Sequence, residues 1–233
     1  MRKIKVLAIC AIAVFSTMNV KAQFATGADI VSSYVWRGVP QEDVTGTKGG
    51  APNIQPFASF TTGKLTVGSW ASSSFTGNLK EVDLYATLAL SSAFAVTVTD
   101  YNYNFGVQPN YFDYSKTTGH VFEGTVAYTG SAFSASVNTM FAGADKKPSD
   151  ATKAALSTYI ELGYQINPIA KVFVGGVLGE SGNYYTTGAG LTNIGFKVSK
   201  SIAITDKFSL PVYGIVGANP YAKTTFFVAG ITL

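Results

Sequence analysis

The chain has almost none of the residues that build metal and redox sites. Its 233 residues include one cysteine, Cys10, and one histidine, His120. Because Cys10 lies in an N-terminal segment with the features of a removable leader, the expected mature chain can form neither a disulfide nor a thiolate site. A single histidine excludes zinc sites built from several histidines, and no nucleophile-elbow or phosphate-loop motif is present. We therefore expect no cofactor, no metal and no enzyme.

Charge is scarce as well, and its distribution weakens one class of function. Charged residues make up 13% of the chain, and the formal net charge is +4. Four basic residues, Arg2, Lys3, Lys5 and Lys21, lie in the first 23 positions, which contain no acid, so the remainder is neutral overall. A nucleic-acid partner needs a basic surface, so we expect none.

The first 22 residues show the order of features of a secretory signal peptide. A basic start precedes an apolar run from Val6 to Phe15, and the segment ends on the small-residue pattern Val20-Lys21-Ala22. A run of about ten residues is short for a spanning helix, which needs about 20, so a retained anchor is the weaker alternative. We expect a signal peptide over residues 1–22 and one domain over residues 23–233.

Beyond this leader, hydrophobic residues alternate along the chain with a period of two. No later stretch approaches eighteen apolar residues, and no long segment has a helical period. In the segment from Phe133 to Phe141, Phe, Ala and Val alternate with Ser and Asn. The segments from Lys80 to Leu90 and from Leu156 to Gln165 follow the same pattern, which predicts strands with one apolar and one polar face.

Twelve such strands are expected. They run over Ala25–Arg37, Asn53–Thr61, Lys64–Ala71, Leu79–Leu90, Phe94–Phe105, His120–Tyr128, Ala132–Ala142, Ala155–Gln165, Lys171–Gly179, Leu191–Ile204, Phe208–Gly217 and Thr224–Leu233. Connections alternate between mostly long and tight, as in outer-membrane barrels, which have long external loops, short periplasmic turns and an even strand number. The predicted fold class is all-β, a transmembrane antiparallel up-and-down β-barrel of about 12 strands, with ten or fourteen as alternatives.

A soluble secreted β protein is the competing architecture. Its polar strand faces would meet water and carry many charges, whereas here they are mostly Ser, Thr, Asn, Gly and Tyr, which suits a polar lumen. Aromatic residues gather at the two interfaces of membrane barrels. We expect this position for Tyr34, Trp36, Tyr101 and Tyr103, with ordinary core packing as the alternative for each.

The charged residues of the strands are expected to face the lumen. Placing Arg or Lys against lipid at the bilayer midplane costs roughly 2 to 4 kcal/mol, so the inward orientation is favoured. About twelve strands enclose a narrow lumen that side chains can constrict. We expect it to be lined by Asp29, Arg37, Glu81, Asp83, Tyr85, Glu123, Tyr159, Glu161 and Lys197, together with Ser33 and Thr125, with Arg37 and Lys197 paired to some of the acids.

Three segments resemble one family of outer-membrane barrels. The segment from Asp29 to Gln41 contains Ser-Ser-Tyr-Val-Trp-Arg-Gly, which is similar to the opening strand of TorF-like porins; Glu81–Tyr85 and Val98–Tyr103 resemble later strands. The resemblance implies a Gram-negative outer-membrane barrel with porin-like transport. The chain departs from the pattern of many such barrels by ending on Leu233 instead of an aromatic residue.

The predicted function is passive diffusion of small polar or weakly cationic solutes through a narrow outer-membrane channel. The expected partners are outer-membrane lipids, the barrel-assembly machinery and small solutes. One alternative is a closed barrel with a structural or surface-interaction role, whose external loop carries mixed charges such as Asp145, Lys146 and Lys153. Another is a lipid-modifying enzyme using His120, which Ser115 in the preceding loop could approach.

Overall fold

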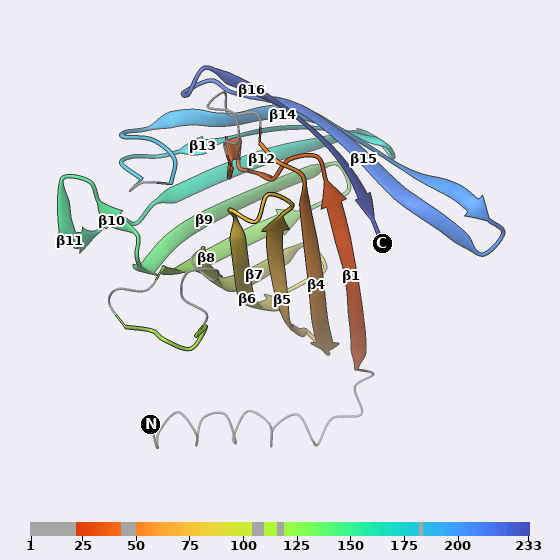
Figure 1. Cartoon of the computed structure of the whole chain (residues 1–233), viewed down its shortest axis with the longest axis horizontal. Helices are drawn as coiled ribbons and strands as arrows, with labels where there is room; N and C mark the ends of the chain where they lie inside the picture. The colour runs from red at the N-terminus through yellow and green to blue at the C-terminus, as the bar shows by residue number, and fades with distance from the viewer. Residues whose placement is uncertain (1–21, 43–49, 104–109, 116–118, 182–183) are drawn as a thin grey trace.

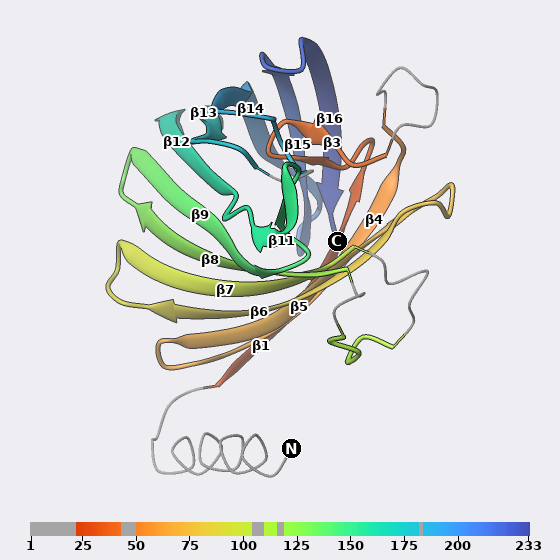
Figure 2. The ribbon, with the colours of Figure 1, turned by 90° about the vertical axis from the view of Figure 1, so that its left-hand side faces the viewer.

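Twelve strands form one closed antiparallel barrel (Figures 1 and 2). The computed structural model describes residues 22–42, 50–103, 110–115, 119–181 and 184–233. The barrel strands are β1 (Gln23–Val31), β4 (Asn53–Thr62), β5 (Leu65–Ser74), β6 (Lys80–Ala89), β7 (Phe94–Asn102), β8 (His120–Thr129), β9 (Phe133–Gly143), β12 (Thr158–Asn167), β13 (Ala170–Val177), β14 (Gly190–Thr205), β15 (Phe208–Asn219) and β16 (Thr224–Thr232). The predicted all-β class and strand number are confirmed. The expected signal peptide lies outside the described residues, apart from Ala22.

Each barrel strand pairs with the next barrel strand along the chain, and β16 returns to β1. Two small hairpins, β2 (Val35–Trp36) with β3 (Val39–Pro40) and β10 (Lys146–Lys147) with β11 (Asp150–Ala154), lie outside this ladder. The described residues contain no helix long and apolar enough to cross a bilayer.

The alternation of side chains sorts apolar residues to the outer surface and polar residues to the interior. On β9, Phe133 is 64% exposed and Phe141 48%, whereas Asn138 is 5% exposed and Met140 0%. Successive residues of a strand point to opposite faces, so this contrast identifies the outer and inner sides of the wall. Exposed Val, Leu, Ile and Phe side chains recur around the other strands. The outer surface is therefore apolar, the reverse of a soluble barrel.

The two ends of the barrel differ in their connections. Tight turns join β4 to β5, β6 to β7, β8 to β9, β12 to β13 and β14 to β15 at one end. β1 begins and β16 ends at this same end. We call it the short-turn end. The opposite, long-loop end carries the longer connections, which join β1 to β4, β7 to β8, β9 to β12 and β13 to β14. At the turn after β4, Gly63 has a φ of 58°, a left-handed conformation that glycine adopts without strain.

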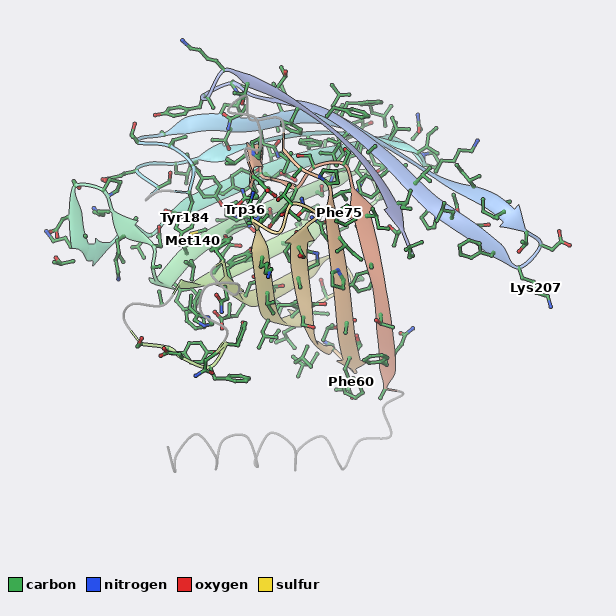
Figure 3. All side chains as sticks on the ribbon, viewed as in Figure 1. Trp36, Phe60, Phe75, Met140, Tyr184 and Lys207 are labelled. Carbon is green, nitrogen blue, oxygen red and sulfur yellow. The ribbon has the colours of Figure 1, made fainter. Side chains whose placement is uncertain are left out.

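The barrel closes along a short seam. β1 pairs with β4 through nine residues but with β16 through only three, Asp29 to Val31. Two further backbone hydrogen bonds join Ala28 to Leu233, at 2.9 and 3.2 Å. β14 and β15 extend past this seam as a long hairpin, with Lys207 at its tip (Figures 1 and 3).

The first strand is shorter than the sequence suggested. β1 ends at Val31, not Arg37, and residues 32–41 turn into the barrel as a separate hairpin, β2–β3, which we call the inner hairpin. Its two turn residues, Arg37 and Gly38, both have positive φ, 51° and 82°, as a two-residue type I′ turn requires. A Cβ atom on Gly38 would lie 1.9 Å from the carbonyl oxygen of Thr192, so the inner hairpin packs directly on the wall.

Candidate functional site

The barrel interior is the candidate site, and the wall places the predicted acidic residues inside it. Residues directly opposite in an antiparallel pair share a face. Asp83 lies opposite both Trp70 and Tyr101, and Glu81, two residues earlier, shares its face. Glu81, Asp83 and Glu123 are each less than 5% exposed. The other expected lining residues, Asp29, Arg37, Tyr85, Tyr159, Glu161 and Lys197, also lie on the inner side, by the same alternation or by contact with inner residues.

Arg37, at the turn of the inner hairpin, spans the interior to the opposite wall. Its Nη1 donates to Oε2 of Glu123 at 2.6 Å and its Nη2 donates to Oε1 at 2.7 Å. Nη1 also donates to the hydroxyl oxygen of Tyr185 at 2.6 Å. The predicted pairing of Arg37 with an acid is confirmed. Because a bidentate pair has fixed geometry, this contact holds the inner hairpin and the loop after β13 against β8.

Aromatic rings enclose the Arg37 guanidinium. Its carbon lies 4.6 Å from the ring centre of Trp36 and 4.9 Å from that of Tyr159. The Tyr185 ring stacks on both, at 5.0 Å from Trp36 and 5.7 Å from Tyr159. The cation therefore sits among ring faces, where the quadrupole of each ring attracts it. Together with Glu123, these residues form a packed layer near the long-loop end, which we call the guanidinium layer.

The four aromatic residues expected at the membrane interface lie inside the barrel instead. Tyr34 is 9% exposed and packs 5.3 Å from Trp70. Trp36, which Figure 3 labels, has its ring centre 5.8 Å from that of Tyr101, and the ring of Tyr101 stacks on that of Tyr103 at 5.7 Å. Tyr34 and Trp36 are inside because the chain turns inward after β1. Tyr101 lies on the inner face of β7, and Tyr103 directly follows that strand. Both are an even number of residues from Thr99, which lies opposite the inward Glu123, so alternation could have indicated this position.

Glu81 and Asp83 form an acidic pair with no basic partner among the described residues. Glu81 is 1% exposed, and no hydrogen bond of ordinary geometry reaches either of its carboxylate oxygens, although Tyr34 and Asp83 lie beside it. Asp83 accepts one bond, from the backbone N–H of Asn102 at 3.2 Å. The hydroxyl of Tyr103 is also buried without a partner. Burial without a cationic partner disfavours ionisation of both carboxyl groups at once.

The interior near the seam is less tightly filled. A cavity of about 400 Å³ is lined by Asp29, Lys197, Tyr213 and neighbouring residues of β14, β15 and β16. Asp29 accepts hydrogen bonds from Thr232 at 2.7 Å and from Tyr213 at 3.3 Å. The expected ion pair of Lys197 with an acid is absent among the described residues, since its ammonium lies 4.5 Å above the Tyr213 ring instead.

Glu161 is held by hydrogen bonds. Its Oε2 accepts from the hydroxyl of Tyr159 at 2.7 Å and from Nδ2 of Asn193 at 3.2 Å. Asn193 also donates to the Tyr159 hydroxyl at 3.2 Å. This set links β12 to β14 and fixes the Tyr159 ring that covers Arg37.

A second polar cluster, on the outer surface of the wall, was not anticipated. Asp100 faces outward, opposite Phe122 and Leu84, and the loop after β7 covers it. Its carboxylate accepts from the hydroxyls of Tyr111 and Tyr114, each at 3.1 Å, and lies 2.7 Å from Nδ1 of His120. Burial and the neighbouring Asp100 raise the pKa of Tyr114 to about 12, so its hydroxyl stays a donor. Alternation places Asp100 on the outer face, where a carboxylate must be covered. The covering residues, Tyr111 and Tyr114, lie in a loop whose position alternation does not predict.

The environment of His120 bears on the enzymatic alternative. A cavity of about 620 Å³ on the outer wall brings Ser115 and His120 to one surface. However, Nε2 of His120 lies 2.8 Å from the carbonyl oxygen of Tyr111, which can only accept, while Nδ1 faces Asp100. In this arrangement neither ring nitrogen is free to take a proton from a serine hydroxyl, as a hydrolase requires.

The described residues contain no group of three or more histidine, cysteine, aspartate or glutamate side chains that could hold a metal ion. Neither a protein-family model nor a curated protein matches this chain. The interior geometry therefore carries the functional argument.

Proposed function

We propose that the protein is an outer-membrane, porin-like channel for passive diffusion of small polar or weakly cationic solutes. The observation that carries the proposal is the sorting of side chains across a closed wall, with Phe133 and Phe141 exposed outward while Asn138 and Glu123 are buried inward. An apolar belt outside and polar groups inside suit a barrel that has lipid around it and solute within it. The resemblance to TorF-like porins points the same way.

The guanidinium layer would be the narrowest point of the route. The inner hairpin and Tyr185 fill the interior near the long-loop end, whereas the cavity near the seam leaves space at Asp29 and Lys197. Solutes would therefore pass only as the Arg37–Glu123 contact loosens, and the conductance should be small. Glu81 and Asp83 lie in the same half of the barrel, and any negative charge on this pair, which has no basic partner, would favour cations there.

The same layer supports the second candidate, a closed barrel with a structural or surface role. Arg37 is bound by Glu123 and Tyr185 and covered by two rings, so the layer could be a permanent core. The two candidates differ in whether the layer opens.

Single-channel recording in planar bilayers separates them. The native barrel should give small, resolved current steps with a weak preference for K⁺ over Cl⁻. The double variant Glu81→Gln/Asp83→Asn should shift the reversal potential toward zero, whereas Lys153→Gln, in an external pair with Asp150, should not. A barrel that inserts without current steps, both native and with Arg37→Ala, would support the closed alternative.

Location needs its own measurement. Outer-membrane fractionation followed by gel migration with and without boiling should show a heat-modifiable band, because closed membrane barrels resist unfolding in detergent at low temperature. Recovery as a soluble periplasmic species would contradict both candidate functions. The proposed partners, outer-membrane lipids and the assembly machinery, depend on this location.

A further inference from the structure

Three lysines lie at or beside the cavity near the seam: Lys197 and Lys200 line it, and Lys171 lies next to Lys197. Lys171 on β13 and Lys197 on β14 are directly opposite in the register, so their Cβ atoms are roughly 4.5–5.5 Å apart on the same inner face. Lys200, three residues after Lys197, starts from the opposite face of β14 but also lines this cavity. We call Lys171, Lys197 and Lys200 the basic mouth.

The basic mouth lacks acidic partners. The ion pairs among the described residues are Arg37–Glu123, His120–Asp100 and Lys153–Asp150, and none includes these lysines. Asp29 is the acid that acts on Lys197, but both of its carboxylate oxygens already accept hydrogen bonds, from Tyr213 and Thr232. Lys197 thus has a single acid beside it, and that acid already accepts hydrogen bonds from two other residues.

The side chains of the opposed pair point away from each other. Lys171 extends across Gly163 toward Ser134, since a Cβ on Gly163 would lie 2.4 Å from Lys171 Cε and 2.5 Å from Ser134 Oγ. Lys197 turns the other way, over the ring of Tyr213. Like charges directly opposite on neighbouring strands repel each other. Their long stems can bring both ammonium groups back if an anion lies between them.

The cavity offers an anion further donors. Beside Lys197 it is lined by Ser199 and Ser201, and its volume of about 400 Å³ exceeds the space that a carboxylate or phosphate group fills. Hydroxyl and ammonium groups are the donors that oxyanions accept from most readily. The cavity lies where β16 ends, so a group bound there meets both the lumen and the short-turn end.

We propose that the basic mouth binds an oxyanion, a carboxylate or phosphate group of a small solute, with Lys197 as the central contact and Lys171 and Lys200 beside it. This proposal deepens the proposed channel function. Only the statement that the bound solute crosses the membrane rests on that function. With acids near the long-loop end and lysines near the seam, the interior suits solutes that carry both signs of charge.

Isothermal titration of the folded barrel in a non-ionic detergent tests the proposal without requiring conduction. The probes are inorganic phosphate and acetate, each titrated against a matched concentration of sodium chloride, to separate a phosphate-selective site from one that accepts carboxylates as well. The native barrel should bind at least one probe saturably. Lys197→Gln should weaken binding about tenfold, the effect of losing one charge-assisted hydrogen bond of about 1.4 kcal/mol.

The matched control is Lys207→Gln, because Lys207 lies at the tip of the β14–β15 hairpin, which also carries Lys197, but outside the cavity. It should bind as the native barrel does. Lys171→Gln should weaken binding by less than Lys197→Gln. Absence of saturable binding to the native barrel, or equal loss in Lys207→Gln, overturns the site. A barrel that binds a probe but passes no current contradicts the channel and leaves the site standing, whereas one that conducts without binding does the reverse.

Discussion

Replacing Arg37 with alanine should both destabilise the barrel and widen it. The substitution removes the two hydrogen bonds to Glu123, at 2.6 and 2.7 Å, the bond to Tyr185, and the contacts with two aromatic rings. It also leaves Glu123, which is 1% exposed, without its counter-charge. Removing one partner of a buried ion pair costs about 3–5 kcal/mol, mostly through the charge left behind.

The free energy of unfolding in detergent, from urea titrations, measures this loss, and single-channel conductance measures the widening. The double variant Arg37→Ala/Glu123→Gln should recover about 2 kcal/mol, because the orphaned charge is gone, which would show as a coupling energy between the two sites. In this double variant the Tyr101 hydroxyl, which donates to Oε1 of Glu123, keeps a side-chain oxygen as its acceptor. If Arg37→Ala costs less than about 1 kcal/mol and leaves the conductance unchanged, then the guanidinium layer neither stabilises nor constricts the barrel.

Three further substitutions test other parts of the structure. Gly38→Ala should destabilise the barrel by more than about 2 kcal/mol, because its φ is 82° and a Cβ would lie 1.9 Å from a backbone oxygen. Gly77→Ala, at a φ of 80° but in open space, should cost only about 1 kcal/mol. Urea titrations compare the two variants, and equal losses would contradict the packing of the inner hairpin. His120→Ala should loosen the loop after β7, because it removes the contact of His120 with the carbonyl oxygen of Tyr111 and with Asp100, giving faster limited proteolysis there, with unchanged cleavage as the contrary result. Glu81→Gln should leave stability unchanged or raise it in thermal melts, since it removes a buried carboxyl group that has no basic partner, and a loss above about 2 kcal/mol would show that Glu81 has a partner in the folded state.

Local pattern was sufficient to predict the wall. The predicted strand from Asn53 to Thr61 is β4 to within one residue, and the predicted strand from His120 to Tyr128 is β8 with one residue more. Alternation also assigned Glu81 and Glu123 to the interior. These inferences succeed because the period of two is imposed on each strand separately by the apolar and polar sides of the wall.

Tertiary contacts decided what the sequence pattern missed. Tyr34 and Trp36 continue the alternation of β1, so the chain looks like one strand as far as Arg37. The turn inward depends on partners far along the chain, such as Glu123, 86 residues away. In the same way, nothing near Asp100 shows that Tyr111 and Tyr114 cover its outward carboxylate.

The seam between β1 and β16 has a consequence for folding. The hydrogen bond from Thr232 to Asp29 joins residues 203 positions apart, so the first strand cannot pair with its last neighbour until the whole chain has been made. Contacts of such long sequence separation form slowly. Until then, β1 and β16 each present an unpaired edge, which is a template for aggregation with other chains. The three-residue seam therefore makes closure the late step of folding, and the chain depends on protection of its two edges until then.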